Sequence, residues 1–269
     1  MYVVGSSGRL GRAITAQYPA ETVELVPREK SGHWCAETGP EDVELFFRNR
    51  ATHSDTIFVA AGLIDPALPG HDLRKVNLSL PMNIVRGTDA LGSRVVTFGT
   101  VMENDGFPRN PYIESKIALR NYLELRPDPR LLHIQLHTLY GVGAPSPFMF
   151  LGQLLEAIRD NEEFEMSSGL QLREFHHVTD EAHAVQLMVQ AGLSGTHLLS
   201  HGNPAILVEI ATSIFSKFGR PEKLKPGAKY DQDSENYSVH FHRHPEVSAV
   251  LFRETFRAIE EYLRECLCD

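Results

Sequence analysis

The sequence predicts an α/β fold with a doubly wound parallel sheet and a smaller α+β lobe. Over the first two-thirds of the chain, short apolar or β-branched runs alternate with longer amphipathic stretches, which is typical of βα units. A glycine-rich segment follows the first run, where a strand would turn into a helix. The chain has 269 residues, more than an average domain of about 150 residues, so it has room for the lobe.

Six runs have the length and composition of buried strands. They are Tyr2–Val4, Val23–Val26, Thr56–Ala60, Val95–Phe98, Leu132–Leu136 and Gly195–Ser200. The stretches between them predict helices at residues 9–17, 40–50, 72–90, 112–125 and 180–191. Thr179 lies just before the last expected helix and Asp180 is its first residue, and side chains of this kind cap helix N-termini.

Two regions interrupt this alternation and are expected to form the lobe. Residues 141–177 are rich in aromatic side chains and methionine, and residues 216–269 end in an amphipathic helix at Glu246–Cys266. The remaining residues, 1–140 and 178–215, are expected to form the domain that contains the sheet. The lobe is therefore expected to combine separate stretches of the chain.

Composition and charge exclude several classes of protein. The chain carries 26 Lys and Arg against 35 Asp and Glu, a net charge of −9, whereas nucleic-acid binding needs clustered basic side chains. No apolar run approaches the roughly 20 residues of a membrane-spanning helix, and the N-terminal residues lack a signal-peptide pattern. We expect a soluble, cytoplasmic protein without nucleic-acid or membrane partners. Cys35, Cys266 and Cys268 do not have disulfide-framework or zinc-site spacing, so reduced thiols are expected.

The histidines do not predict a metal site. His240, His242 and His244 alternate and would share one face of a strand, and His176 and His177 form a second group. No nearby pair of acids completes an evident metal site with either group. We therefore expect these histidines to be solvated or to belong to the lobe, and we expect no metal.

The strongest local motif is a glycine-rich loop at the N-terminus. Residues 2–11 read YVVGSSGRLG, a short strand that runs into G-x-x-G-x-x-G and then a helix. Glycines at such a turn let the backbone approach a pyrophosphate and let the helix pack on the sheet. The motif predicts a Rossmann-type domain, against the alternative of a tight turn only. The expected dinucleotide contacts are Gly5, Ser6, Ser7, Gly8, Arg9, Leu10 and Gly11.

The residues after the second strand indicate which dinucleotide binds. An acidic residue there usually holds the ribose hydroxyls, whereas a basic residue accommodates a 2′-phosphate. This strand is followed by Pro27 and Arg28, with no Asp. NADP(H) is therefore favoured, and NAD(H) is the alternative if Arg28 is only a solvated loop cation. After the next strand, Ala60, Ala61 and Gly62 are small enough for the backbone to pass close to the cofactor.

Tyr112 and Lys116 are the candidate catalytic pair. They lie four residues apart in PYIESK and share one face of the expected helix, since helix neighbours recur at this spacing. An ammonium that close would lower the pKa of the Tyr112 phenol and let it exchange a proton with a substrate hydroxyl or carbonyl.

These motifs occur in an order that resembles the extended short-chain dehydrogenase/reductases, in particular the nucleotide-sugar epimerase, dehydratase and reductase group. The matching segments are GSSGRLG, AAG, KVNLSLP, RVVTFGT, YIESK, LYGVGAPSPF, QLREFHHVTD and GTHLLSHGNPAILVEIA. The resemblance implies that Tyr112 is the acid/base and that Lys116 tunes the phenol and binds the nicotinamide ribose. It also implies that Asn77 lies near the cofactor, on a helix beside the active site, and that the protein forms a homodimer.

The resemblance also supplies a third polar residue. Alignment of the strand RVVTFGT puts Thr100 where the family's Ser or Thr contacts the reacting oxygen of the substrate, and Thr97 is the alternative. The chain departs from the family's V-Y-G turn, because VME follows Thr100. It also lacks the Asp-Glu pair by which related 4,6-dehydratases eliminate water, which leaves reduction or epimerisation at C4.

Arg173 and Phe148 are the candidate substrate contacts in the lobe. QLREF resembles an R-D-F/Y element whose arginine can approach a nucleotide diphosphate, and the alternative for Arg173 is an ion pair with an acid such as Asp180. Phe148 would line a base or sugar pocket, although an aromatic run after a turn is also typical of a core.

With the resemblance, these residues imply an NAD(P)H-dependent reductase of a nucleotide-linked keto-sugar, a 4-ketoreductase, with hydride from the nicotinamide and a proton from Tyr112. One alternative is an NAD-dependent nucleotide-sugar epimerase, in which bound NAD takes and returns the hydride. The other is a non-catalytic NAD(P)-binding sensor or scaffold.

Overall fold

The structure, a computed structural model, describes residues 1–65, 67–104, 109–230 and 241–268. The chain forms two compact units, Met1–Leu136 with Ala182–Leu199 and His137–Glu181 with Ser200–Asp269. These units differ from the expected domains mainly at residues 200–215, which belong to the second unit rather than to the domain that contains the sheet.

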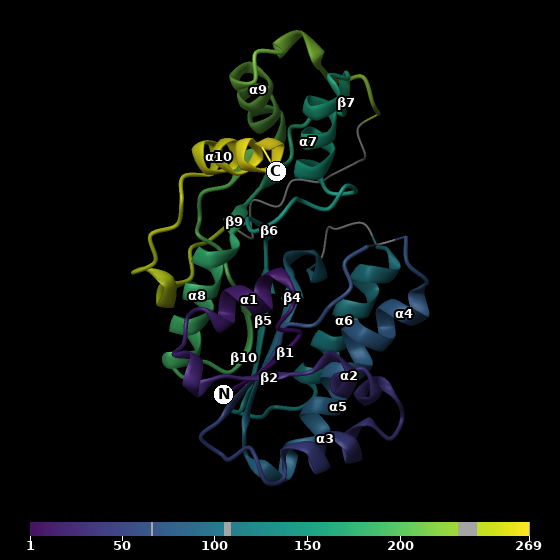
Figure 1. Cartoon of the computed structure of the whole chain (residues 1–269), viewed down its shortest axis with the longest axis vertical. Coiled ribbons are helices and arrows are strands. Elements are labelled where there is room, and N and C mark those ends of the chain that lie inside the picture. Colours follow the sequence, from purple (N-terminus) through teal and green to yellow (C-terminus); the bar gives the residue numbers. More distant parts are fainter. Residues whose placement is uncertain (66, 105–108, 231–240, 269) are drawn as a thin grey trace. The chain divides into compact units, whose positions relative to one another are not determined.

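The first unit is built on a six-stranded sheet in which every strand pairing is parallel (Figure 1). Its strands are β1 (Tyr2–Val4), β2 (Glu24–Val26), β3 (Thr56–Val59), β4 (Arg94–Thr100), β5 (Leu131–Leu136) and β10 (Gly195–Leu198). The order across the sheet is β10-β5-β4-β3-β1-β2. Strands covered on both faces need nearly continuous apolar runs, and β1 and β5 are buried throughout. The predicted parallel sheet and its six strands are confirmed.

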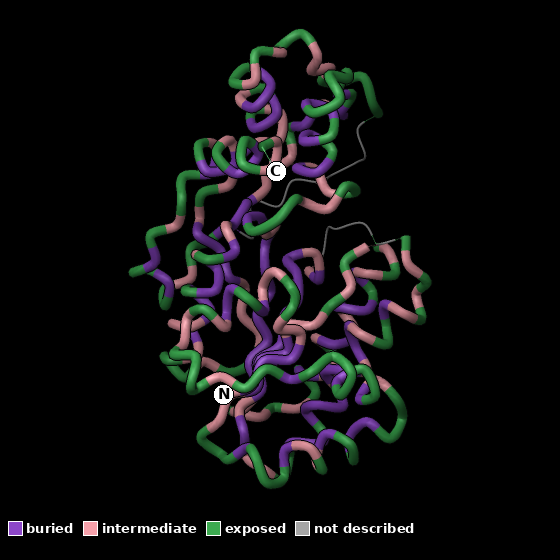
Figure 2. The backbone as a smooth tube through the Cα atoms, viewed as in Figure 1, coloured by how far each residue is buried: buried purple, intermediate pink, exposed green. Residues whose placement is uncertain are grey.

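Helices cover both faces of this sheet. They are α1 (Arg9–Thr15), α2 (Arg28–Ser31), α3 (Gly39–Phe47), α4 (Gly70–Arg74), α5 (Leu80–Gly87), α6 (Pro111–Glu124) and most of α8 (Val178–Gln190). In Figure 1, α1 and α8 lie on one face and α3, α5 and α6 on the other, with the buried strands between them in Figure 2. A π-helical turn at Lys75–Ser79 separates α4 from α5, so the helix expected at 72–90 is divided.

Among its described residues, the second unit contains three complete helices and six short strands. They are β6 (Thr138–Tyr140), α7 (Phe150–Asp160), β7 (Phe164–Met166), β8 (Leu172–Arg173), β9 (Phe175–His177), β11 (Ala205–Ile206), α9 (Leu207–Lys217), β12 (Leu224–Pro226) and α10 (Thr255–Cys268). The strands form the pairs β6-β9, β7-β12 and β8-β11. The tail helix expected from residue 246 begins only at Thr255, because the Glu254 carboxylate accepts hydrogen bonds from the backbone N of Phe256 at 3.1 Å and of Arg257 at 2.8 Å.

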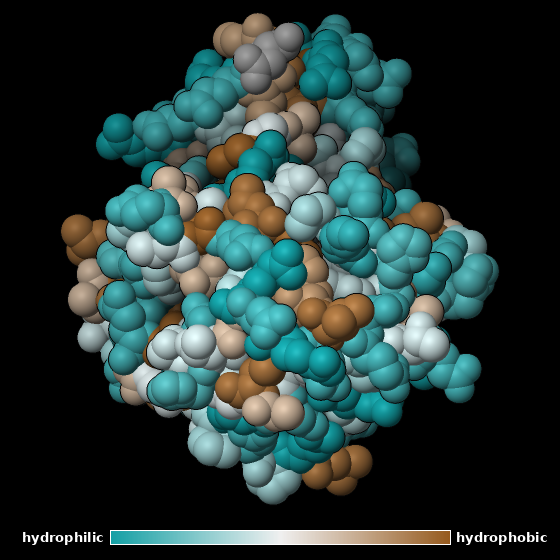
Figure 3. Space-filling view, turned by 60° about the horizontal axis from the view of Figure 1, so that its bottom comes forward, coloured by the Kyte–Doolittle hydropathy of each residue, from teal (hydrophilic) through white to brown (hydrophobic). Residues whose placement is uncertain are grey.

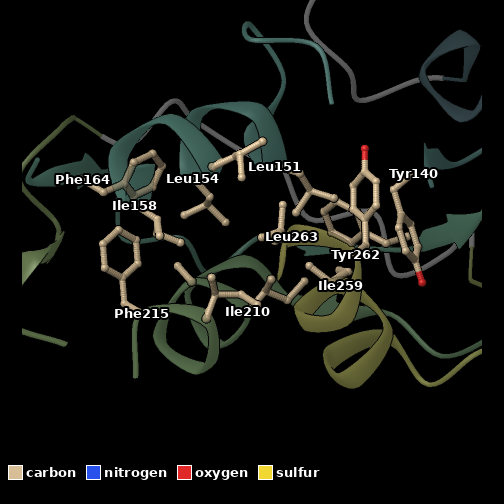
Figure 4. Close-up of a cluster of buried hydrophobic side chains, with 14 of the residues drawn as sticks. Tyr140, Leu151, Leu154, Ile158, Phe164, Ile210, Phe215, Ile259, Tyr262 and Leu263 are labelled. Atoms are coloured by element: carbon tan, nitrogen blue, oxygen red, sulfur yellow. The ribbon is translucent and has the colours of Figure 1, made fainter. Parts of the chain in front are cut away.

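The helices of the second unit meet in one apolar core (Figure 4). Leu154 from α7, Ile210 and Phe215 from α9, and Ile259 and Leu263 from α10 are all 0% exposed. This core explains why residues 200–215 belong to the second unit: the apolar face of α9 is buried there.

The face of the molecule shown in Figure 3 is largely hydrophilic, with small separate apolar areas. Within the described part of the chain, no helix has both the length and the apolar character needed to cross a membrane. No disulfide is present among the described residues, which include all three cysteines.

We expect Leu154→Ala to reduce the free energy of unfolding by about 2–5 kcal/mol, because truncation of a buried leucine loses apolar burial and leaves a cavity. Leu251→Ala is the matched control: Leu251 is 92% exposed, and its truncation should cost less than about 0.5 kcal/mol. Urea unfolding followed by circular dichroism compares the two. Similar losses would contradict the core described for α7.

Candidate active site

The glycine loop follows β1 and packs against the loop that follows β3. Gly5 has a φ of +83°, and a Cβ at this position would lie 2.4 Å from the backbone N of Ala61. A Cβ on Gly11 would lie 2.2 Å from the carbonyl oxygen of Gly5. Both positions therefore require glycine. The structure brings the predicted loop and the Ala60–Gly62 segment together at the carboxyl ends of two adjacent parallel strands, where sheets of this kind bind nucleotides.

Arg28 lies at the same edge of the sheet. Val26 pairs with Val4 in the parallel register of β2 and β1, so the chain leaves both strands at the same edge. Arg28 then begins α2, and its side chain is exposed. An exposed guanidinium at the sheet edge from which the glycine loop also leaves is suited to contact an anionic group.

Tyr112 and Lys116 lie on α6, which has a well-defined start. The Oδ1 of Asn110 accepts a hydrogen bond from the backbone N of Ile113 at 2.9 Å, as is typical of an N-cap. Lys116 is 7% exposed, and its Nζ donates to the carbonyl oxygen of Phe98 on β4 at 2.9 Å. This bond anchors the ammonium to the sheet.

Thr100 is the threonine beside the phenol. Its side chain lies close enough to the Tyr112 phenol to lower the pKa of that phenol. The alternative from the sequence, Thr97, instead contacts the Nδ1 of His133 at 2.8 Å within the buried sheet. The structure thus brings Thr100 and Tyr112 into contact, with Lys116 one helical turn further along α6.

Glu103 is a buried residue of this site that the sequence analysis did not assign. Its carboxylate accepts a hydrogen bond from the backbone N of Thr100 at 2.7 Å and from the Nε2 of Gln135 at 3.0 Å, and lies 3.1 Å from the Nε2 of His133. A Cβ on Gly99 would lie 2.0 Å from the Glu103 Oε1, so glycine makes room for the carboxylate. Thr100 and Glu103 form a capping box, and their T-x-x-E spacing was a signal for it in the sequence.

Burial and the charge of Glu103 shift the pKa values of Tyr112 and Lys116. Burial raises the pKa of Tyr112, the negative charge of Glu103 raises it further, and the nearby Thr100 side chain opposes both effects. Burial lowers the pKa of Lys116, and Glu103 opposes that change. The expectation that the pKa of Tyr112 is lowered is therefore wrong, because desolvation and the Glu103 charge dominate.

Asn77 joins the loop after β3 to α6. Its Oδ1 accepts from the backbone N of Leu63 at 2.8 Å, and its Nδ2 donates to the carbonyl oxygen of Leu63 at 2.8 Å and to Ser115 Oγ at 3.1 Å. A Cβ on Gly62 would lie 3.5 Å from the Asn77 Oδ1 and 3.7 Å from the Lys116 Nζ. Asn77 thus holds this loop against α6 through contacts within the protein.

The two candidate substrate contacts, Phe148 and Arg173, belong to the second unit. Phe148 is 38% exposed, so it is not a core residue, whereas Phe150 packs against the core. Asp180, the alternative partner of Arg173, forms its ion pair with Arg253. The exposure of Phe148 is not that of a core side chain, and the assignment of Arg173 to the substrate stays a prediction.

A cavity of about 500 Å³ in the first unit lies away from these residues. Its lining includes Pro127, Leu131 and Gly195, so it lies at the amino ends of β5 and β10. Parallel sheets bind ligands at their carboxyl ends, and we do not assign this cavity to the cofactor.

The model of the NAD dependent epimerase/dehydratase family matches residues 1–199 of the chain. The search of curated proteins finds no match. The solved structures of similar fold include the dTDP-4-dehydrorhamnose reductase of Clostridium acetobutylicum, at 18% identity and a TM-score of 0.74, with 98% of each chain covered. The Bacillus anthracis enzyme of the same name, in complex with NADP, has 15% identity and a TM-score of 0.74, with 98% of this chain and 97% of that chain covered. The Thermus thermophilus UDP-glucose 4-epimerase, in complex with NAD, has 18% identity and a TM-score of 0.71, with 99% and 98% covered.

We expect Glu103→Gln to move the titration of Tyr112 to lower pH, because it removes the negative charge that raises the pKa of the phenol. Tyrosinate absorbance against pH, with the Tyr112→Phe curve subtracted, measures this. Glu114→Gln is the matched control, since Glu114 is exposed on the same helix and solvent screens its charge. An unchanged midpoint in Glu103→Gln, or an equal change in the control, would contradict the role given to Glu103.

Proposed function

Because the chain belongs to the NAD dependent epimerase/dehydratase family, we propose that it is an NADPH-dependent reductase that converts the C4 carbonyl of a nucleotide-linked sugar into a hydroxyl. The observation that carries this proposal is the approach of the Thr100 side chain to the Tyr112 phenol, close enough to lower its pKa, one helical turn from the buried Lys116. The fold likeness to two dTDP-4-dehydrorhamnose reductases supports the choice of substrate class.

The residues at the edge of the sheet fit a nicotinamide dinucleotide. Gly5 and Gly11 have no side chain, and a Cβ at either position would clash with neighbouring backbone. The backbone of this loop can therefore approach a pyrophosphate. Residues Gly5–Gly11 would hold the pyrophosphate, with Ala60–Gly62 alongside and Lys116 at the nicotinamide ribose. Arg28 would bind the 2′-phosphate, which favours NADP(H) over NAD(H).

When bound, NADPH supplies the hydride that reduces the carbonyl carbon. The phenol of Tyr112 donates its proton to the carbonyl oxygen, and the Thr100 hydroxyl polarises the same oxygen. The raised pKa of Tyr112 keeps the phenol protonated at neutral pH, which is the form that reduction requires. The Lys116 ammonium stabilises the tyrosinate that remains. In the second unit, Arg173 and Phe148 are proposed to contact the nucleotide part of the substrate.

An NAD-dependent 4-epimerase is the second candidate, and the fold likeness to the Thermus thermophilus UDP-glucose 4-epimerase in complex with NAD favours it. Arg28, where an acid would hold the ribose hydroxyls of NAD, favours the reductase. The two functions differ in cofactor use: an epimerase consumes no NADPH in net terms, whereas a reductase oxidises one NADPH per product. The expected homodimer remains a prediction.

We expect Tyr112→Phe to slow NADPH oxidation by at least about 100-fold, because loss of a general acid typically costs that much. The rate is followed at 340 nm with a panel of nucleoside-diphosphate 4-keto-sugars. Tyr122→Phe is the matched control on the same helix and should keep the parental rate. Turnover by Tyr112→Phe at the parental rate would exclude the proposed mechanism, and lack of turnover by the parent with every sugar would favour a sensor or scaffold.

We expect Arg28→Ala to weaken NADPH binding by about 10-fold or more, as a charge-assisted hydrogen bond is worth about 1.5–3 kcal/mol, and to leave NADH binding unchanged. Calorimetric titration gives both dissociation constants. Lys30→Ala, another exposed cation of α2, is the control and should bind both cofactors as the parent does. An equal loss for NADPH and NADH would show that Arg28 does not contact the 2′-phosphate.

A further inference from the structure

Three ionisable side chains are buried together in the second unit, outside the candidate active site. Glu174 lies between β8 and β9, His176 lies in β9, and Glu181 lies in the first turn of α8. Their exposed fractions are 1%, 1% and 0%. Buried charges are costly unless they are paired, so the contacts within this group decide its charge.

His176 lies between the two carboxylates. Its Nε2 is 2.8 Å from the Glu174 Oε2, and its Nδ1 contacts the Glu181 Oε2. An ionised carboxylate only accepts hydrogen bonds, whereas a neutral imidazole carries a single N–H. Both contacts are therefore hydrogen bonds to ionised carboxylates only when both ring nitrogens of His176 carry protons, which makes the ring a cation.

The two carboxylates depend on this ring to different degrees. Glu174 also accepts hydrogen bonds from the Ser200 Oγ and from the backbone N atoms of the two residues after it. The second oxygen of Glu181, Oε1, has no hydrogen-bond partner in the described part of the chain. Without the proton on the His176 Nδ1, the buried Glu181 carboxylate would lose the hydrogen bond that the structure shows for it.

Two more histidines and an arginine lie near this group. The His201 ring stacks on the His176 ring with centroids 4.4 Å apart, and the His201 Nδ1 accepts a hydrogen bond from a backbone N at 3.1 Å. The His137 Nε2 lies 3.7 Å from the Glu174 Oε2. Arg243, whose charge acts on His201, donates to three backbone carbonyls. Because the His201 Nδ1 is an acceptor, His201 is neutral, and His176 is the charged ring of the stack.

The pKa values of these groups agree with the geometry. Burial lowers the pKa of His176, but the charges of Glu181 and Glu174 and the hydrogen bonds to them outweigh burial and raise it to about 9. Burial and the charge of His176 lower the pKa of His201 to about 4. Burial raises the pKa of Glu174, but the hydrogen bond to His176 and the charges of the neighbouring histidines outweigh burial and lower it to about 2.

We propose that Glu174, His176 and Glu181 form a charged lock that holds β9 to the first turn of α8 and that opens when His176 loses its proton. A neutral ring keeps one N–H, so one of the two carboxylates must then stay buried without its hydrogen bond to the ring, which is strongly destabilising. Through Glu174 the lock also holds residues 200–202.

The lock does not depend on the proposed function, because none of its residues is assigned to cofactor, substrate or proton transfer. Arg173 directly precedes Glu174, so the lock also fixes the backbone beside that proposed substrate contact. This one consequence rests on the proposed function.

The direction of the pH dependence follows from these pKa values. A group whose pKa is higher in the folded chain contributes stability below its unfolded value, here 6.5 for His176, and that contribution is lost as the pH rises through about 9. For Glu174, whose pKa is lowered, the contribution is present above 4.5 and is lost as the pH falls through about 2. The lock is therefore closed at neutral pH and opens in alkaline solution.

The test compares the full-length parent with His176→Gln by urea unfolding at pH 6 and pH 10, followed by circular dichroism. Because the variant cannot form the cation, we expect the ratio of the parent's folding equilibrium constant to that of the variant to fall by about 100-fold or more from pH 6 to pH 10. NMR of protein labelled with ¹⁵N-histidine reads the protons directly, and the signals absent from His176→Gln identify His176. At pH 7 both ring nitrogens should carry a proton, and one proton should be lost as the pH rises through about 9.

His242→Gln is the matched control. His242 is exposed and belongs to the other histidine group considered from the sequence, of which His240 lies outside the described residues. Its ratio to the parent should stay nearly constant between the two pH values, because solvent screens its charge.

The proposal is wrong if the ratio for His176→Gln is equally constant. It is also wrong if only one ring nitrogen of His176 carries a proton at pH 7, since the shared proton would then belong to a carboxyl group. Should circular dichroism show His176→Gln unfolded, Glu181→Gln, which keeps the size of the side chain, decides instead. It should move the deprotonation of His176 to lower pH, and an unchanged midpoint would contradict the lock.

Discussion

The parallel direction of all six strands is the constraint on which the candidate active site depends. Parallel strands end at the same edge of a sheet, so the glycine loop after β1, the Ala60–Gly62 segment after β3 and Thr100 at the end of β4 all lie at that edge. α6 then crosses over this sheet, and the bond from Lys116 to the Phe98 carbonyl fixes its position. No single segment could assemble these groups, whereas the sheet does so by its topology alone.

The buried Glu103 carboxylate has two effects at this edge. It holds the backbone N of Thr100, and its partners His133 and Gln135 extend the network into β5. A buried charge without such partners would be strongly destabilising. The same charge raises the pKa of the phenol and favours the charged form of Lys116. A phenol whose pKa is raised stays protonated, and a protonated phenol suits a site that donates a proton.

The second unit combines an apolar core with a buried polar cluster. Helices α7, α9 and α10 supply the core, and Glu174 accepts bonds from the Ser200 Oγ at 2.9 Å and from the backbone N of His201 at 3.0 Å and of Gly202 at 2.8 Å. These bonds hold segments far apart in sequence. A small unit assembled from separate stretches depends on such links, because each stretch alone buries little apolar surface.

Local patterns in the sequence were enough to predict the parallel sheet, the glycine loop and the Tyr112–Lys116 pair, because each depends on residues that are neighbours along the chain. Other features were decided by tertiary structure alone. The contact of Thr97 with His133 and the raised pKa of Tyr112 depend on burial and on contacts with distant residues, and so does the cluster of Glu174, His176 and His201. Burial and contacts between distant residues exist only once the chain is folded, so periodicity and spacing do not reveal them.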